Sequence, residues 1–248
     1  MGLIRLVLRV AAMVAGLIAC VPLHYAWKLA RLPSPWPRRF LWWIGRSAGM
    51  QASVVGKPLE QDVLFVANHL SWMDIVLVAG ATGTAFVSKA EVARYPLVGW
   101  LAGLNNTVFV ARSERNAVRG QADALRAALS AGQPVTLFPE GTTDGGADTL
   151  PFRASLLASL FPPLPGLRVQ PVALDYGAAA HDIAWVGEES ALANARRILS
   201  RPGTTPVIIR FLAPVDPAEA GDRKALAAAA RAEIHDALDP SAKAADRL

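Results

Sequence analysis

The chain has 248 residues, of which 53% are hydrophobic, and its mean hydropathy of +0.31 is high for a water-soluble protein. This length predicts one α/β domain with a sizeable core and a short extra segment. The single cysteine, Cys20, excludes an internal disulfide framework and a cysteine metal cluster. The four histidines lack zinc-binding spacing and no glycine-rich nucleotide motif occurs, so we expect no metal and no cofactor.

Charge is distributed unevenly along the chain. The first 59 residues carry eight basic residues and no acid, a charge of +8, so the total of +5 leaves −3 for residues 60–248. Four of the seven tryptophans, at positions 27, 36, 42 and 43, lie in the same segment. Tryptophan beside Arg and Lys is typical of a membrane interface, where each basic residue adds about 1 kcal/mol of attraction to an anionic leaflet. The basic balance therefore predicts membrane lipids, and no nucleic acid, as partners.

Residues 1–50 are expected to form a membrane-associating helical arm. Its uninterrupted apolar run, Val10 to Leu23, would be about 21 Å long as a helix, too short for a hydrocarbon core of about 30 Å. A helix extended from Leu6 to Trp27 would be about 33 Å long, but this stretch includes Arg9, Pro22 and His24. We favour a helix that dips into or lies along the cytoplasmic leaflet, and a single span stays open.

A cleaved signal also stays open, because Leu17-Ile18-Ala19-Cys20 resembles a lipoprotein signal box. The proline-rich stretch 33–37 then predicts a break before a second helix, 38–50, in a hairpin-like arm.

The rest of the chain, residues 51–240, alternates predicted strands and helices as one domain, and the small, polar residues 241–248 are expected to fray. Strands are predicted at 52–56, 62–67, 84–88, 107–111, 134–138, 168–174, 183–187 and 206–212. Helices are predicted at 72–80, 114–131, 152–160, 190–200 and 219–238. This alternation favours an α/β fold with a mostly parallel or mixed central sheet flanked by helices.

The segment from Asn68 to Asp74 follows directly on the apolar strand Val63–Ala67. Ligands bind at the carboxyl ends of strands in open α/β sheets. Histidine changes charge near neutral pH and a carboxylate can fix its tautomer, so His69 is a candidate general base and Asp74 its partner. Five residues on one helix turn through about 500°, so His69 must lie in the strand-to-helix turn and Asp74 in the first helical turn. Ser71 and Asp74 also fit a capping box, a purely structural explanation.

Two further predicted strands end in polar residues. The strand 107–111 is followed directly by Arg112, and the strand 134–138 is followed by Pro139-Glu140-Gly141-Thr142-Thr143. These groups and His69 are expected to meet at one edge of the sheet.

Taken in order, these blocks resemble the glycerolipid or lysophospholipid acyltransferase family over roughly residues 50–215. The family patterns N-H-x-x-x-x-D, F-[IV]-x-R, [FV]-P-E-G-[TS] and V-x-P-V match residues 68–74, 109–112, 138–142 and 169–172. The segments 88–91 and 96–100 also resemble the stretch between the family's first two blocks. Ala111 departs from the pattern, since many members carry an acidic residue there.

The resemblance implies direct acyl transfer from a thioester to a lysolipid hydroxyl, with His69 as general base and Asp74 orienting it. No serine sits in a G-x-S-x-G elbow at a strand-to-helix turn, so no acyl-enzyme is expected. Arg112 is implied to contact an acceptor phosphate, and amides near Gly141 are candidate oxyanion donors. The remaining candidate substrate contacts are Asn68, Lys89, Glu140, Thr142 and Arg153.

The expected acceptor is 1-acyl-sn-glycerol-3-phosphate, which would yield phosphatidic acid. The alternative is a lyso-ornithine lipid, whose head group lacks phosphate. Acyl-CoA or acyl-acyl carrier protein is the expected co-substrate. Because such donors are cytoplasmic, we expect the cytoplasmic face of a bacterial-type inner membrane. A non-enzymatic membrane-binding protein and an exported lipoprotein hydrolase using Cys20 are the alternatives from other classes.

Overall fold

The computed structural model describes residues 1–89, 93–94, 96–110, 115–143, 145–146 and 149–239. The helices are α1 (Gly2–Leu29), α2 (Trp36–Ser47), α3 (Trp72–Thr82), α4 (Pro96–Leu104), α5 (Arg115–Ser130), η2 (Ala154–Leu160), η3 (Gly177–Ala179), α6 (Ala180–Ile183), α7 (Ala191–Ser200) and α8 (Arg223–Leu238). The strands are β1 (Met50–Val55), β2 (Val63–Ala67), β3 (Ala85–Lys89), β4 (Val108–Val110), β5 (Val135–Leu137), β6 (Arg168–Asp175) and β7 (Thr205–Phe211).

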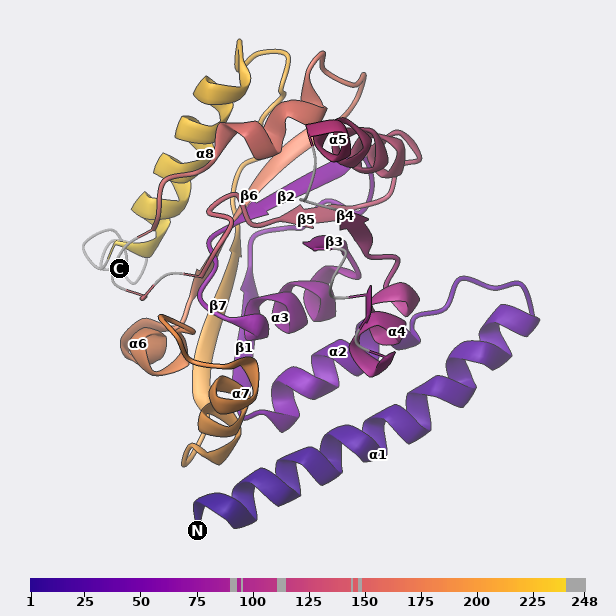
Figure 1. The fold of residues 1–248 in the computed structure, drawn as a ribbon, viewed down its shortest axis with the longest axis vertical. Coiled ribbons are helices and arrows are strands. Elements are labelled where there is room, and N and C mark those ends of the chain that lie inside the picture. Colours follow the sequence, from indigo (N-terminus) through magenta and orange to yellow (C-terminus); the bar gives the residue numbers. More distant parts are fainter. Residues whose placement is uncertain (90–92, 95, 111–114, 144, 147–148, 240–248) are drawn as a thin grey trace.

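The strands form one mixed sheet in the order β1-β7-β6-β2-β5-β3-β4. Among the strands that the structure describes, β6 and β7 pair antiparallel and the other pairs are parallel, so β6, β2, β5, β3 and β4 run in the same direction. Their carboxyl ends therefore lie along one edge, as the sequence predicted. Strand β2 is the middle strand of the seven, between β6 and β5 (Figure 1).

Helices cover both faces of the sheet, which confirms the predicted α/β class. Residues 63, 65 and 67 of β2 pack with α3, α7 and part of α2, whereas Leu64 and Val66 pack with α5, η2 and α8. This alternation follows from the two-residue repeat of a strand. Because both faces of β2 are buried, its sequence is a continuous apolar run. Figure 1 shows α5 and α8 on one side of the sheet and α2 and α3 on the other.

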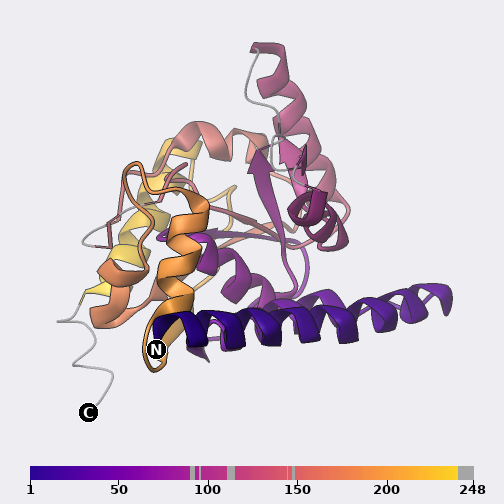
Figure 2. The same ribbon diagram turned by 60° about the horizontal axis from the view of Figure 1, so that its bottom comes forward.

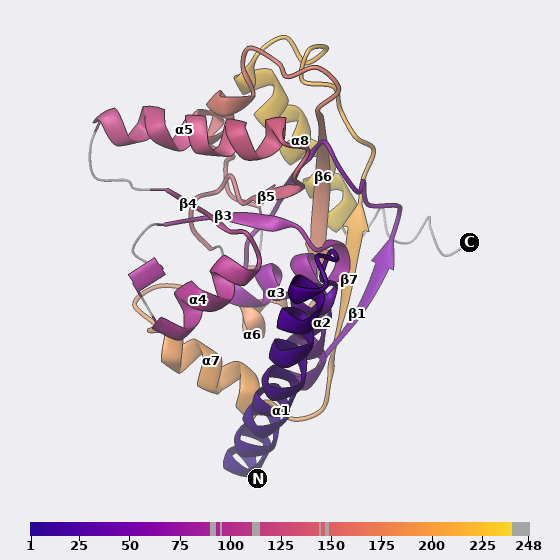
Figure 3. The same ribbon diagram turned by 90° about the vertical axis from the view of Figure 1, so that its right-hand side faces the viewer.

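The N-terminal arm begins with one continuous helix rather than a short apolar segment. Helix α1 has 28 residues, includes Pro22 and is about 42 Å long by helical rise. By length and composition it could cross a membrane, and its most apolar window is not buried against the protein. It runs alongside α2 and extends beyond the sheet (Figures 2 and 3).

Helix α1 is hydrogen-bonded both to α2 within the arm and to α7 in the rest of the protein. Trp43 on α2 donates from Nε1 to the Ala12 carbonyl at 2.8 Å. Arg5 and Arg9 donate to carbonyls at the end of α7 and in the turn after it, including Ser200 O at 3.0 Å and Gly203 O at 2.8 Å. Cationic side chains are favourable at a helix C-terminus, where carbonyls lack helical partners.

Two predicted elements differ from the structure, and helix α4 was not predicted. The predicted strand at 183–187 is wrong, because Ile183 ends the short helix α6 and no strand follows it there. The helix predicted at 152–160 is a 3-10 helix, η2. Helix α4 lies in a segment that resembles the family, but the sequence pattern did not predict a helix there. The predicted tail 241–248 lies outside the described residues.

Candidate active site

A histidine and an aspartate form a close pair at the carboxyl end of β2. His69 Nδ1 lies 2.8 Å from Asp74 Oδ2. His69 follows β2 in the loop and Asp74 lies in the first turn of α3, so the predicted geometry is confirmed. The His69 side chain is 17% exposed, whereas that of Asp74 is fully buried. With Nδ1 engaged, Nε2 is the imidazole nitrogen left to meet a reacting hydroxyl.

Asp74 also completes the capping box of α3, whose N-cap residue is Ser71. Its Oδ2 atom accepts hydrogen bonds from the backbone amides of Leu70 and Ser71 at 2.6 and 2.8 Å. The Ser71 hydroxyl in turn accepts from the Met73 amide, which completes the capping box. The catalytic and structural explanations of this motif therefore apply to the same carboxylate, because the cap fixes Asp74 where it meets His69.

Tyr176 contacts Asp74, and the sequence did not predict this contact. Its hydroxyl donates to Asp74 Oδ1 at 2.6 Å, so each carboxylate oxygen has a donor. Burial, and then the Asp74 charge, raise the pKa of Tyr176 well above its ordinary value, so the phenol remains a proton donor. Tyr176 follows β6 and is 102 positions from Asp74, so only the pairing of β6 with β2 brings them together.

The segment after β5 forms the wall beside His69. The Phe138 ring stacks on the imidazole with ring centroids 4.1 Å apart and planes inclined by 14°. Glu140 is buried and Thr142 is exposed. Gly141 has a φ of 73°, a conformation that favours glycine, and its amide donates to Phe138 O at 3.1 Å. That amide is therefore engaged within its own turn, which leaves the Thr142 segment as the exposed part.

Arg153 lies over this turn. Its backbone amide donates to Pro139 O at 2.8 Å. A Cβ atom added to Gly141 would lie only 3.3 Å from the Arg153 guanidinium carbon. The structure thus brings Arg153 against the predicted glycine turn and leaves its role in substrate binding a prediction.

Asn68 joins β2 to β6 rather than facing an open site. Its side-chain oxygen accepts from the Leu174 amide at 2.8 Å and its Nδ2 donates to the Leu174 carbonyl at 3.1 Å. Both ends of this buried amide are used, so Asn68 fixes the loop that carries His69. Its predicted contact with substrate stays a prediction.

Two predicted residues are at or beyond the limit of the described chain. Arg112 and the side chain of Lys89 lie outside the described residues. The backbone of Lys89 ends β3, and β4 precedes Arg112. Since β5 and β3 separate β4 from β2, strand spacing puts β4 about 14 Å from the strand before His69.

The segment 184–189 lies next to the catalytic loop. The Trp185 amide donates to Leu70 O at 2.8 Å, and the Thr143 hydroxyl donates to the Trp185 carbonyl. This segment is secured by α7, because Arg197 forms two hydrogen bonds with Glu189 at 2.9 and 2.7 Å. Hydrogen bonds from Arg197 and then Asn194 lower the pKa of Glu189 to about 2, so this carboxylate remains ionised near neutral pH.

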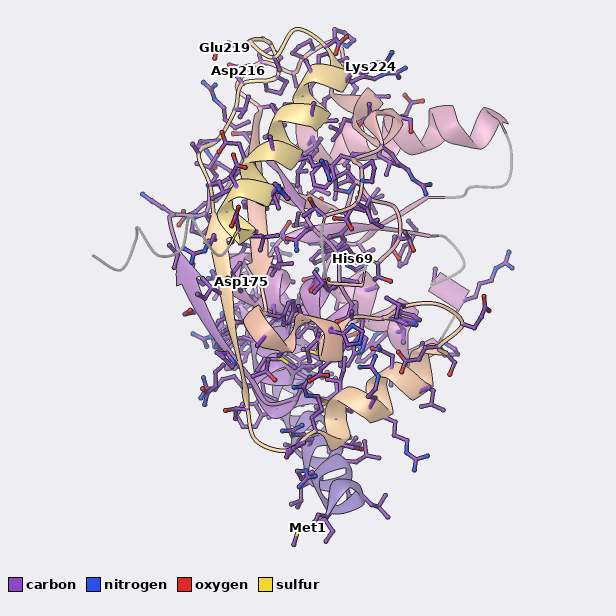
Figure 4. The ribbon with its side chains drawn as sticks, turned by 90° about the vertical axis from the view of Figure 1, so that its left-hand side faces the viewer. Met1, His69, Asp175, Asp216, Glu219 and Lys224 are labelled. Carbon is purple, nitrogen blue, oxygen red and sulfur yellow. The ribbon has the colours of Figure 1, made fainter. Side chains whose placement is uncertain are left out.

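Helix α7 also contacts the catalytic helix directly. Asn194 is fully buried; its oxygen accepts from Trp72 Nε1 at 3.1 Å and its Nδ2 donates to Glu189 at 2.8 Å. Trp72 is the first residue of α3. Figure 4 places His69 between α8 and α7 on this face of the protein.

A buried carboxylate paired with a partly exposed imidazole, beside a glycine turn at the edge of a mixed sheet, is an arrangement that can support general-base chemistry. A sequence model of the acyltransferase family matches residues 51–175, which include these groups. This chain belongs to the acyltransferase family, and its resemblance to lysolipid acyltransferases is confirmed.

The relatives differ in the acceptor that their names give. Lyso-ornithine lipid O-acyltransferases from Brucella abortus and Pseudomonas aeruginosa are each 35% identical; the first alignment covers 91% of both chains, and the second covers 96% of this chain and 95% of the relative. A 1-acyl-sn-glycerol-3-phosphate acyltransferase from Neisseria meningitidis is 34% identical over 69% of each chain.

A solved structure confirms the fold. The 1-acyl-sn-glycerophosphate acyltransferase PlsC from Thermotoga maritima aligns with a TM-score of 0.62 at 22% identity, over 100% of this chain and 99% of its own. The likeness therefore includes the N-terminal helices as well as the sheet.

Proposed function

We propose that this enzyme transfers a fatty acyl group from a thioester directly to the free hydroxyl of a lysolipid, with His69 as general base. The observation that carries the proposal is the 2.8 Å contact between His69 and the buried Asp74 at the carboxyl end of β2. A buried carboxylate with donors on both oxygens is held in one position, so it can orient the imidazole and stabilise its protonated form.

The proposed step needs no covalent enzyme intermediate. Nε2 of His69 takes the hydroxyl proton while the hydroxyl oxygen attacks the thioester carbonyl. The tetrahedral intermediate then expels the thiolate, which regains a proton from the imidazolium. General-base assistance of this kind contributes roughly 10²–10⁴ in rate. Because the Gly141 amide donates to the Phe138 carbonyl, the proposed oxyanion donor is the backbone amide of Thr142.

We infer that the acceptor is a lyso-ornithine lipid. Two relatives with that name, from Brucella abortus and Pseudomonas aeruginosa, align over more than nine-tenths of both chains, whereas the Neisseria relatives named for 1-acyl-sn-glycerol-3-phosphate align over 69%. The glycerophosphate acceptor is the second candidate. The block ending in Arg112 favours it, because a guanidinium fork suits phosphate. The donor is acyl-CoA or acyl-acyl carrier protein.

The proposed location is the cytoplasmic face of the inner membrane, with α1 lying along the leaflet. The supporting contacts are those of Arg5 and Arg9 with the end of α7, because they hold the first turns of α1 against the catalytic domain. A helix tied to the domain at that end is better placed to lie beside it in the interface than to cross the bilayer.

The acceptor is tested with membranes containing the wild type or the His69→Ala variant, offered lyso-ornithine lipid and lysophosphatidic acid separately. We expect His69-dependent product from lyso-ornithine lipid. Product from lysophosphatidic acid alone would contradict the acceptor but retain the mechanism. No His69-dependent product from either lipid, in folded protein, would contradict the proposed function.

A further inference from the structure

A groove beside α2 brings three arginines together outside the active site. It has a volume of about 450 Å³ and is lined by Arg38, Arg39, Trp42, Trp43, Arg46, Val54, Gly80 and Ala81. The lining contains no acidic residue. The groove therefore joins a concentrated positive charge to two indole rings.

Close helix packing creates this groove. A Cβ atom on Gly80 of α3 would lie 2.8 Å from the Trp42 backbone, so the glycine allows α2 to approach α3 closely. Trp43, on the same helix as Trp42, reaches the Ala12 carbonyl of α1. The groove thus lies where α2 meets the C-terminal end of α3, next to α1.

The groove is separate from the catalytic dyad. Asp74 lies in the first turn of α3 and Gly80 in its last, and the 11 residues of this helix are about 16 Å long. Arg38 donates to the carbonyls of Gly80 and Ala81 at 3.3 and 2.5 Å, so it caps the end of α3 opposite Asp74. A ligand in the groove would contact the catalytic helix without entering the active site.

The charge in the groove is not balanced by the protein. Within the described ranges, none of the three arginines forms an ion pair. The Arg39 guanidinium lies 4.9 Å from the centre of the Trp36 ring, and Arg46 is exposed. Three like charges in one groove repel each other and attract an anion. Guanidinium groups match phosphate oxygens in geometry.

We propose that this groove binds the phosphate of an anionic membrane phospholipid, with Arg39 and Arg46 as the principal contacts. The side chain of Trp43 is 46% exposed and adjoins α1, whose outward apolar side chains include Val7 and Leu8. Tryptophan is enriched at the level of lipid head groups, so a membrane lipid fits this position better than a soluble phosphate. The inference rests on the proposed membrane association and not on the identity of the acceptor.

The test is co-sedimentation of the full chain with vesicles of phosphatidylcholine alone and of phosphatidylcholine mixed equally with phosphatidylglycerol. The groove variant is Arg39→Gln/Arg46→Gln. The matched control is Arg196→Gln/Arg223→Gln, which removes the same charge from exposed positions elsewhere. We expect the groove variant to lose on the order of tenfold in affinity for the mixed vesicles and to bind phosphatidylcholine as the wild type does. The control should lose clearly less.

Equal losses in the two variants would overturn the proposal, because charge alone would then explain binding. Loss of phosphatidylcholine binding would also overturn it, since apolar docking would have failed instead. If inorganic phosphate releases the protein from the mixed vesicles and chloride at equal ionic strength does not, the groove binds a soluble anion and the proposed lipid ligand is wrong. His69→Ala should bind vesicles normally, so failure of the catalytic mechanism is distinguishable. Retained acyl transfer to a detergent-dispersed acceptor by the groove variant would support a separate site.

Discussion

At the scale of single residues, the Asp74 carboxylate both stabilises the start of α3 and contacts the proposed base, His69. Asp74 Oδ2 accepts from His69 and from two backbone amides, and Oδ1 accepts from Tyr176. An asparagine could not reproduce this arrangement, because its amide nitrogen donates where the carboxylate accepts. The spacing N-H-x-x-x-x-D therefore encodes both a helix start and the position of the imidazole.

Tyr176→Phe removes one donor to Asp74 without removing the aromatic ring. A hydrogen bond to a charged group is worth about 1.5–3 kcal/mol, so we expect kcat to fall on the order of tenfold or more with little change in KM. Steady-state kinetics with a lysolipid acceptor measure this, and Tyr25→Phe, at a half-exposed position on α1, is the control. An unchanged kcat in a variant with a lowered Tm would give Tyr176 a structural role only.

The sequence predicted the pair of His69 and Asp74, but it did not predict the contact of Tyr176 with Asp74. His69 and Asp74 are five positions apart, so helix geometry alone constrained their arrangement. Tyr176 is 102 positions from Asp74, and no local rule connects them. The signal that could have identified it is its place directly after the strand containing V-x-P-V, at the same edge as His69.

At the scale of elements, α7 connects the N-terminal arm to the catalytic loop. Its C-terminal carbonyls accept from Arg5 and Arg9, whereas Asn194 contacts Trp72 at the start of α3. The segment 184–189 lies between α7 and Leu70 and is bonded to both. This arrangement gives α7 a role in holding the loop of His69 in place.

Asn194→Ala removes the acceptor of the Trp72 Nε1 hydrogen bond, whereas Glu189 and the Ala184 carbonyl keep their bonds to Arg197. We expect a loss of about 1–3 kcal/mol in the free energy of unfolding, and about 2–4 °C in Tm for each kcal/mol at this chain length. We also expect kcat to fall at temperatures where the variant is fully folded. Arg196→Ala, at an exposed position of the same helix, is the control. A lowered Tm with wild-type kcat would mean that α7 stabilises the fold without positioning the catalytic loop.

The same elements explain why the predicted strand 183–187 was wrong. Two of its apolar residues, Ile183 and Ala184, are at most 1% exposed, as a buried strand would require, whereas Val186 is exposed. However, the Ala184 carbonyl accepts from Arg197, and the Trp185 amide donates to Leu70. Backbone groups satisfied by side chains and a loop need no strand partner. Local composition predicts burial, but it does not predict which groups will satisfy the backbone.

At the scale of the whole molecule, the sequence predicted the division between a basic arm and a mixed-sheet domain. The charge of +8 before residue 60 identified the arm, and the alternating pattern identified the fold class. The sequence did not predict that α1 would be continuous through Pro22 or that Arg5 and Arg9 would bind α7. Those contacts depend on where α7 ends in space, some 190 positions further along the chain.

The central claim is that His69, held by Asp74, is the base for acyl transfer. The most direct measurement is kcat of purified His69→Ala and wild type at saturating donor and acceptor, with equal Tm and vesicle binding as controls. The account predicts a loss of roughly 10²–10⁴ in kcat for His69→Ala, with membrane binding intact. A folded His69→Ala enzyme whose kcat stays within a few-fold of wild type would contradict it.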